Sequence, residues 1–479
     1  MEAKHRLLHL IAAEVAINIK LHGEFTCFHS VFDQWDDSLA HTTILTVLEF
    51  FGVSEKWLVF FRKFLEVPLK FLGEPVGPRT RRRGLPGSHI LSGVFGEVIL
   101  FCLDFSVARN TDGSFVHRIY DDLWFWSSDH SKCVEAWKTV ATFAKAMGVS
   151  LNLSTSGTAH ITRTPTQPPV DHGILPAGQI RWGFLYLEPA TGTFEIDQSI
   201  IDIQIEGLRR QLQDERSSIF DWILAWNTYA TTYLTTNFGK PANSFGKEHV
   251  DKLLSTYERI HRTLFSGDSK SVFDHVKNML KARFGAHDIP DGFLLFPIEL
   301  GGLGLKNPFI GPLQIRDSVL ENPYSPLDKF EECEKDAYKA AKSRFEKHRP
   351  LHGRRYHDWV PESDKSTFFP FEEYIRHREV LDYKYTNQLA DVFDQLMNPP
   401  KARGAESSPK VLGRINGVQK DAQGIVPPWS DMEPYWQTVA ELYGPEIIDR
   451  FGGLNIVDPG LLPTGMISLL RGKRAKWDS

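Results

Sequence analysis

Residues 117–126 place two adjacent aspartates between two apolar, strand-like runs. They read HRIYDDLWFW, and the runs on both sides carry the β-branched and aromatic side chains that strands favour. Asp is a common turn residue, so a β-hairpin that turns at Asp121 and Asp122 would explain the pattern without any function. Paired carboxylates at a strand end are also the ligands with which proteins hold divalent metals for chemistry on phosphate. Both interpretations begin with the same hairpin, and the rest of the chain has to separate them.

The composition describes an ordinary globular protein with room for several domains. The 479 residues are 42% hydrophobic and carry a net charge of −5, which argues against non-specific coating of nucleic acid but allows a locally basic groove. The four cysteines are scattered without a CxxC pair, which indicates a reducing intracellular compartment, nucleus or cytoplasm. No signal peptide is recognisable. The longest apolar run, residues 94–108, contains Glu97 and Asp104 and is too short to cross a bilayer, so no membrane partner is expected.

Hydrophobic periodicity divides the chain into an α+β part and a helical remainder. Strand candidates and amphipathic helices alternate over residues 1–190, and helical stripes dominate residues 191–320. Residues 321–479 add further helices, with a flexible linker near 398–411. We therefore expect an antiparallel sheet with flanking helices, followed by an all-α region and a helical carboxy-terminal extension.

Several segments resemble motifs of the reverse transcriptase family, and they occur in that family's order. The phrase at residues 41–65, together with YDDLWFW, is most similar to the cellular, non-mobile reverse-transcriptase-related proteins of fungi. The segments are RRGLPGSHILSGVFGEV (82–98), YDD (120–122), MGVSLNLSTSG (147–157), WGFLYL (182–187), LGGLGL (300–305) and HTTILTVLEFFGVSEKWLVFFRKFL (41–65).

The resemblance implies a right-hand polymerase. Residues 1–190 would form a palm, residues 191–320 a helical thumb, and residues 321–479 an extension. The implied activity is template-directed nucleotidyl transfer of the RNA-directed DNA polymerase type, with a nucleic acid template and primer and deoxynucleoside triphosphates as partners. Such an enzyme uses two Mg²⁺ (or Mn²⁺) ions to activate the attacking oxygen and to stabilise the leaving pyrophosphate. Oligomeric state is not implied.

The implied metal ligands are incomplete in this sequence. Asp121 would be the main ligand and Asp122 its assistant, but the third carboxylate of the family falls on Val31 when SLAH (38–41) is aligned. Asp33 points to the same face as Val31 because side chains alternate along a strand, yet it lies about 7 Å further along. Asp33 could replace the missing ligand only if the strand slipped or bulged.

The resemblance also implies residues that would bind nucleotide and nucleic acid. Trp35 would stand at the steric gate that excludes a ribose 2′-hydroxyl, and a core aromatic at a strand end explains it equally well. The glycine-proline turn would support template and nucleotide, and the basic run before it would contact phosphate unless it is only an exposed loop. The turn residues are Gly84, Pro86 and Ser88, and the basic residues are Arg79, Arg81, Arg82 and Arg83.

Two further departures keep an inactive protein open as an alternative. Thr155 stands where the family has the lysine of its KTG motif, and little chain precedes the first palm motif, so the fingers region is largely missing. The alternatives are an active nucleotidyltransferase, a catalytically dead palm that binds nucleic acid or acts as a scaffold, and the product of a decaying or mispredicted gene.

Overall fold

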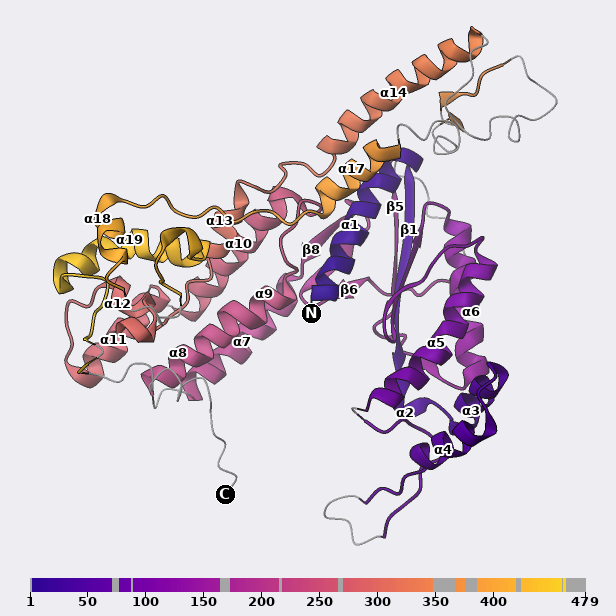
Figure 1. Ribbon diagram of the computed structural model, residues 1–479, viewed down its shortest axis with the longest axis horizontal. Helices are drawn as coiled ribbons and strands as arrows, with labels where there is room; N and C mark the ends of the chain where they lie inside the picture. Colours follow the sequence, from indigo (N-terminus) through magenta and orange to yellow (C-terminus); the bar gives the residue numbers. More distant parts are fainter. Residues whose placement is uncertain are drawn as a thin grey trace.

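The computed structural model combines helices with antiparallel sheets, which agrees with the predicted α+β class. The described residues form two sheets, where the sequence predicted one. Figure 1 shows an elongated molecule, with the larger sheet at one end and helices α7–α13, α18 and α19 extending away from it. The structure describes residues 2–70, 77–87, 89–163, 173–214, 218–265, 270–347, 367–371, 373–374, 386–418, 424–458 and 460–461.

The sheet region contains alternating helices and strands, as the sequence predicted for residues 1–190. The helices are α1 (Glu2–His22), α2 (Trp35–Ser38), α3 (His41–Phe50), α4 (Glu55–Leu65), α5 (Ile90–Asn110) and α6 (His130–Met147). The strands are β1 (Glu24–Asp33), β2 (His117–Ile119), β3 (Asp122–Ser127), β4 (Ser150–Leu151) and β5 (Gly157–Thr162).

The later elements are a small sheet and a series of helices. The strands are β6 (Arg181–Trp182), β7 (Leu185–Glu188) and β8 (Thr193–Ile196). The helices are α7 (Gln198–Asp214), α8 (Ile219–Asn227), the π-helix η2 (Thr228–Tyr233), α9 (Leu234–Asn237), α10 (Gly246–Leu264), α11 (Val272–Phe284), α12 (Asp291–Leu295), η3 (Ile298–Leu300), α13 (Ile310–Arg316), α14 (Ser325–Glu346), α17 (Thr386–Met397), α18 (Pro409–Ile415), η5 (Trp429–Asp431) and α19 (Pro434–Phe451).

Strand β1 is the centre of the larger sheet. It pairs antiparallel with β3 on one side and with β4 and β5 on the other, and β2 forms the edge beyond β3. Because side chains alternate along a strand, Phe28 faces a core with α3–α6, whereas Cys27 faces α1. The sheet is therefore covered on both faces, by α5 and α6 on one and by α1 on the other (Figure 1).

Helix α5 is a long apolar helix of the sheet region. Its 21 residues are long and apolar enough to cross a membrane by length and composition, so the prediction that this apolar run is too short is wrong. A core helix passes the same test, and α5 buries Phe95, Ile99 and Leu103 against the sheet region. Its other face exposes Val94, Phe101 and Phe105.

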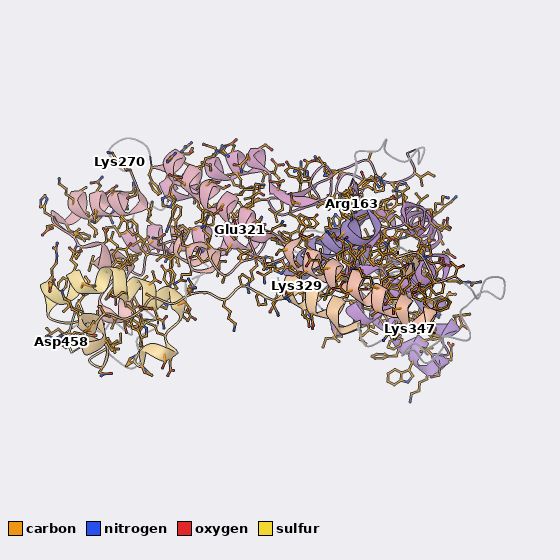
Figure 2. The ribbon with its side chains drawn as sticks, turned by 90° about the horizontal axis from the view of Figure 1, so that it is seen from above. Arg163, Lys270, Glu321, Lys329, Lys347 and Asp458 are labelled. Carbon is orange, nitrogen blue, oxygen red and sulfur yellow. The ribbon has the colours of Figure 1, made fainter. Side chains whose placement is uncertain are left out.

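The hydrophobic cores cross both predicted domain boundaries. One core joins α1 and the larger sheet to β6–β8 and to α7, α8, α10 and α11, across residue 190. Another joins residues 295–310 to residues 411–454, and a third packs α14 and α17 on α1. Residues 398–408, in the predicted linker, form no regular element. Viewed from above in Figure 2, α14 runs from near Lys329 toward Lys347, whereas Lys270 and Asp458 lie at the opposite end of the molecule.

Candidate functional site

The acidic hairpin, residues 117–127, turns one residue earlier than the sequence suggested. Ile119 pairs with Asp122, so the two turn residues are Tyr120 and Asp121. Tyr120 has φ +60°, a left-handed conformation that is costly for a bulky residue and normally taken by glycine. Asp122 is therefore the first residue of β3 rather than a turn residue, and only Asp121 lies in the turn.

Contacts to two other elements hold Tyr120 in this conformation. Its hydroxyl donates a hydrogen bond to Asp36 Oδ1 at 2.6 Å. The hydroxyl also lies against Gly96 of α5, where an added Cβ would be 2.2 Å from the phenol oxygen. Burial and the neighbouring Asp36 carboxylate raise the pKa of Tyr120, so the phenol stays a hydrogen-bond donor. The strained turn is thus fixed by packing and by one short hydrogen bond.

The Asp122 carboxylate is already engaged within the protein. Its Oδ1 accepts hydrogen bonds from His29 Nε2 and from Trp124 Nε1, both at 2.8 Å. Lys4 Nζ of α1 lies 3.6 Å from Oδ2. The His29 and Trp124 rings stack with centroids 4.2 Å apart. The residue directly opposite Asp122 in β1 is Val31, so methyl groups stand where a second carboxylate would be needed.

The pKa values of the two adjacent aspartates shift in opposite directions. Burial pushes the pKa of Asp122 upward, but the hydrogen bond and charge of His29, the charge of Lys4 and the Trp124 bond outweigh it and hold that pKa below its usual value. Burial, and then the charges of Asp122 and Asp36, raise the pKa of Asp121. The folded protein therefore favours the anionic form of Asp122 and disfavours the anionic form of Asp121.

The third expected carboxylate does not complete a metal site. Asp33 is exposed at the end of β1, where it pairs with Ser150 of β4. It lies two residues beyond Val31, about 7 Å along the strand. Within the described part of the chain, no group of three or more His, Cys, Asp or Glu side chains could hold a metal ion. The residues do not fit the two-metal site that the resemblance implies, and the roles predicted for Asp33, Asp121 and Asp122 gain no support from this geometry.

Trp35 lies in the core. Its side chain is only 2% exposed, and its ring packs at 4.7 Å from the ring of Phe32. This burial agrees with the interpretation of Trp35 as a core aromatic at a strand end. It does not agree with a ring that faces the sugar of a bound nucleotide.

The glycine-proline turn docks against the chain that follows β1. Gly84 has φ +83°, and a Cβ there would lie 3.2 Å from the Asp37 carbonyl oxygen, so the position requires glycine. His41 Nε2 bonds to the Gly84 carbonyl at 2.9 Å. The carbonyl of Pro86 accepts a 2.6 Å bond from a serine in the first turn of α5. Ser88 lies outside the described residues, so its predicted role is not addressed.

This region, residues 77–87, carries four arginines, and we call it the arginine turn. Arg81 donates to the Leu85 carbonyl at 3.0 Å, and Arg83 lies 3.5 Å from the Ser38 carbonyl. Within the described ranges, no carboxylate forms an ion pair with Arg81, Arg82 or Arg83. The main chain of Arg79 pairs with that of Leu69.

The residues that engage the acidic hairpin were not identified from the sequence. Strand alternation could have found two of them, because His29 lies two residues before Val31 and Trp124 two residues after Asp122, on the same face. No local signal could have found Lys4, whose contact to Asp122 spans most of the sheet region.

No known family model matches the chain, and no curated protein matches it. Several solved structures are similar to part of it, and telomerases are among them. Apo telomerase from Candida tropicalis shares 10% identity, with a TM-score of 0.32 over 58% of this chain and 51% of that chain. A form truncated from the C-terminal domain shares 12% identity, with a TM-score of 0.30 over 41% of this chain and 39% of that chain.

Telomerase from Candida albicans, in complex with a TWJ fragment of telomeric RNA, shares 10% identity with a TM-score of 0.29, over 58% of this chain and 51% of that chain. The chain thus spans about half or less of the length of these telomerases. Similarity at this level is distant, so the function has to be inferred from the geometry of the site. The assignment to the fungal non-mobile subgroup stays a prediction.

Proposed function

We propose that this chain is a reverse-transcriptase-like palm that has lost nucleotidyl transfer and retains nucleic-acid binding at the arginine turn. The observation that carries the proposal is the cross-strand pair of Val31 and Asp122. One member offers no ligand oxygen, and the other already has its oxygens occupied by His29, Trp124 and Lys4.

The hydrogen bonds that Asp122 accepts disfavour metal binding by its carboxylate. Binding a cation through Oδ1 would break two hydrogen bonds and leave the His29 and Trp124 donors buried without partners. Each such loss costs about 1–3 kcal/mol. The two-metal chemistry of polymerases needs carboxylates that face the same point from neighbouring strands. A valine opposite Asp122 cannot supply one of them.

The arginine turn supplies a surface that fits phosphate. Gly84 fixes the shape of this turn. No described carboxylate forms an ion pair with Arg81, Arg82 or Arg83. Unpaired cations on a rigid turn bind phosphates through counterion release, which needs no particular sequence. We therefore expect salt-dependent binding with little sequence preference, although the whole chain is acidic.

A second candidate function is active template-directed nucleotidyl transfer with Mg²⁺ or Mn²⁺, using a template, a primer and deoxynucleoside triphosphates. One observation favours it. Burial raises the pKa of Asp121, and the charges of Asp122 and Asp36 raise it further. A bound cation would relieve their repulsion.

Binding of a fluorescein-labelled RNA, followed by anisotropy over a range of salt concentrations, tests the proposal. The protein should bind more weakly as salt rises. The double variant Arg82→Gln/Arg83→Gln should bind less tightly and should reduce the slope of log K against log salt by about 1–2. Arg262→Gln, an exposed arginine of α10 far along the chain, is the matched control and should leave the slope unchanged. Equal slopes for all three proteins, or no binding, would contradict the proposal.

A further inference from the structure

Helix α4 exposes aromatic rings next to unpaired cations. The side chains of Trp57 and Phe60 are 54% and 49% exposed, and their ring centroids lie 5.9 Å apart in an edge-to-face contact. Phe61 stacks behind Trp57 at 6.0 Å and contacts Phe95 of α5 at 5.1 Å. The exposed rings are therefore braced from behind by the core, which fixes their orientation before any ligand arrives.

Two lysines flank these rings along the helix. Lys56 and Lys63 lie four residues before and three residues after Phe60, so all three share one face of α4. We call Lys56, Trp57, Phe60 and Lys63 the α4 platform. Neither lysine forms an ion pair or a side-chain hydrogen bond with any described residue. Elsewhere lysines are commonly paired, as Lys20 is with Asp328 and Glu331.

The platform continues into the arginine turn. Helix α4 ends at Leu65, and the main chain of Leu69 pairs with that of Arg79 at 2.8–2.9 Å. Over residues 49–83 the sequence has eight Lys or Arg residues against four Glu, a net charge of +4, while the whole chain has −5. Helices α4 and α5 lie at one end of the molecule (Figure 1). The positive charge of residues 49–83 is therefore found at that end.

We infer that the α4 platform binds single-stranded nucleic acid, with unpaired bases stacked on Trp57 and Phe60 and the backbone phosphates on Lys56, Lys63 and the arginine turn. This inference rests on the proposed function and adds the class of nucleic acid. Exposed aromatic rings accept unpaired bases, whose faces are free, whereas in a duplex the faces are already stacked. Cations alone would bind both forms. The combination of rings and cations is what favours single strands.

The chemistry of the patch distinguishes this partner from a membrane surface. A helix that lies on a membrane has a continuous apolar face opposite its charged face. On α4, Lys56 and Lys63 stand on the same face as Phe60, so charged and apolar groups are not separated onto opposite faces of the helix. Rings flanked by cations complement the bases and phosphates of a nucleic acid strand.

Competition between oligouridylate and a matched RNA duplex tests the inference on the full-length protein. The measured quantity is the dissociation constant from fluorescence anisotropy for each ligand. In Trp57→Ala/Phe60→Ala we expect the affinity for oligouridylate to fall about tenfold or more, because stacking of each base contributes substantially, and the affinity for the duplex to change little. Phe105→Ala, an equally exposed aromatic of α5 outside the platform, is the control and should change neither.

The outcomes separate this inference from the proposed function. If Arg82→Gln/Arg83→Gln weakens both ligands while Trp57→Ala/Phe60→Ala weakens neither, the platform inference is wrong and the arginine turn still binds nucleic acid. If wild-type protein binds neither ligand, the proposed function itself fails. Binding to anionic phosphatidylserine vesicles that depends on Trp57 and Phe60, without an effect of these residues on oligouridylate, would also overturn the inference. Melting curves verify that the variants are folded.

Discussion

The acidic hairpin and the basic region of α4 and the arginine turn differ in how their polar groups are satisfied. In the hairpin, Asp122 is bound by His29 and Trp124, Tyr120 by Asp36, and Arg118 by Glu97 and Asp104. In the basic region, the cations of Lys56, Lys63 and Arg82 have no carboxylate partner within the described part of the chain, and two aromatic rings are half exposed.

This difference indicates where the molecule can bind another. A polar group that is already hydrogen-bonded and partly buried must break those bonds to accept a ligand, at a cost of about 1–3 kcal/mol per group. An exposed, unpaired cation has no such cost. Asp122 is bound within the folded protein, whereas the cations without a described carboxylate partner lie in the basic region.

The largest expected effect on stability comes from Asp122→Ala. The substitution leaves the buried donors of His29 and Trp124 without an acceptor, which should lower the free energy of unfolding by about 3 kcal/mol at neutral pH. Urea denaturation measures it. The exposed Asp33→Ala is the matched control and should change stability by less than about 0.5 kcal/mol. If both variants changed the free energy of unfolding equally, the hydrogen bonds to Asp122 would not stabilise the fold, contrary to this prediction.

The stabilities of wild type and Asp122→Ala should depend differently on pH. The pKa of Asp122 is lowered in the folded protein, so its contribution is complete above the unfolded-state value of about 3.9 and is lost as pH falls through the folded value. Wild type should therefore lose stability more steeply than Asp122→Ala below about pH 4. Parallel acid titrations of the two proteins, followed by circular dichroism, would show that Asp122 is not held as an anion.

Gly96→Ala should have the next largest effect, because the new Cβ would lie 2.2 Å from the Tyr120 hydroxyl. We expect a loss of about 1–3 kcal/mol as the hairpin shifts. Gly93 lies in the same helix, and a Cβ added there would meet no atom within 4 Å, so Gly93→Ala should stabilise the protein by about 0.5–1 kcal/mol. Chemical denaturation measures the free energy of unfolding of both variants. If Gly96→Ala stabilised the protein as much as Gly93→Ala, Tyr120 could not be packed against Gly96 of α5.

We expect the smallest effects on stability from substitutions of two arginines, Arg118 and Arg82. Arg118 donates bonds to both Asp104 and Glu97 and is 14% exposed, so Arg118→Gln should cost about 1–2 kcal/mol. Arg82 has no ion pair with a described residue, so Arg82→Gln should change stability by less than about 0.5 kcal/mol while weakening nucleic-acid binding. Thermal melting and anisotropy on the same two variants should give opposite rankings, and the same ranking in both assays would break the comparison.

Local sequence patterns predicted most of the sheet region. The alternation of strand candidates and helices over residues 1–190 predicted the α+β character of this region, because these patterns depend on residues close together in the sequence. The turn of the hairpin was placed one residue too late, since the contacts that stabilise Tyr120 at positive φ come from Asp36 and Gly96, far away in the sequence.

The state of the candidate site could not be read from the motif alone. The aspartates of YDD look the same in the sequence whether they hold a metal or accept protein hydrogen bonds. The difference lies in His29 and Lys4, which reach Asp122 only after β1 and α1 have packed. The replacement at Val31 was visible in the sequence, and the cross-strand pairing places it directly opposite Asp122.

Primer extension on RNA and DNA templates, first with Mg²⁺ and then with Mn²⁺, tests the loss of nucleotidyl transfer most directly. Wild type, Asp121→Ala and Val31→Asp are compared. The proposal predicts no extension by wild type or Asp121→Ala, although wild type still binds the template. Extension by Val31→Asp alone would locate the loss at the position opposite Asp122. Extension by wild type that disappears in Asp121→Ala would contradict the proposal, because the acidic hairpin would then be a working catalytic site.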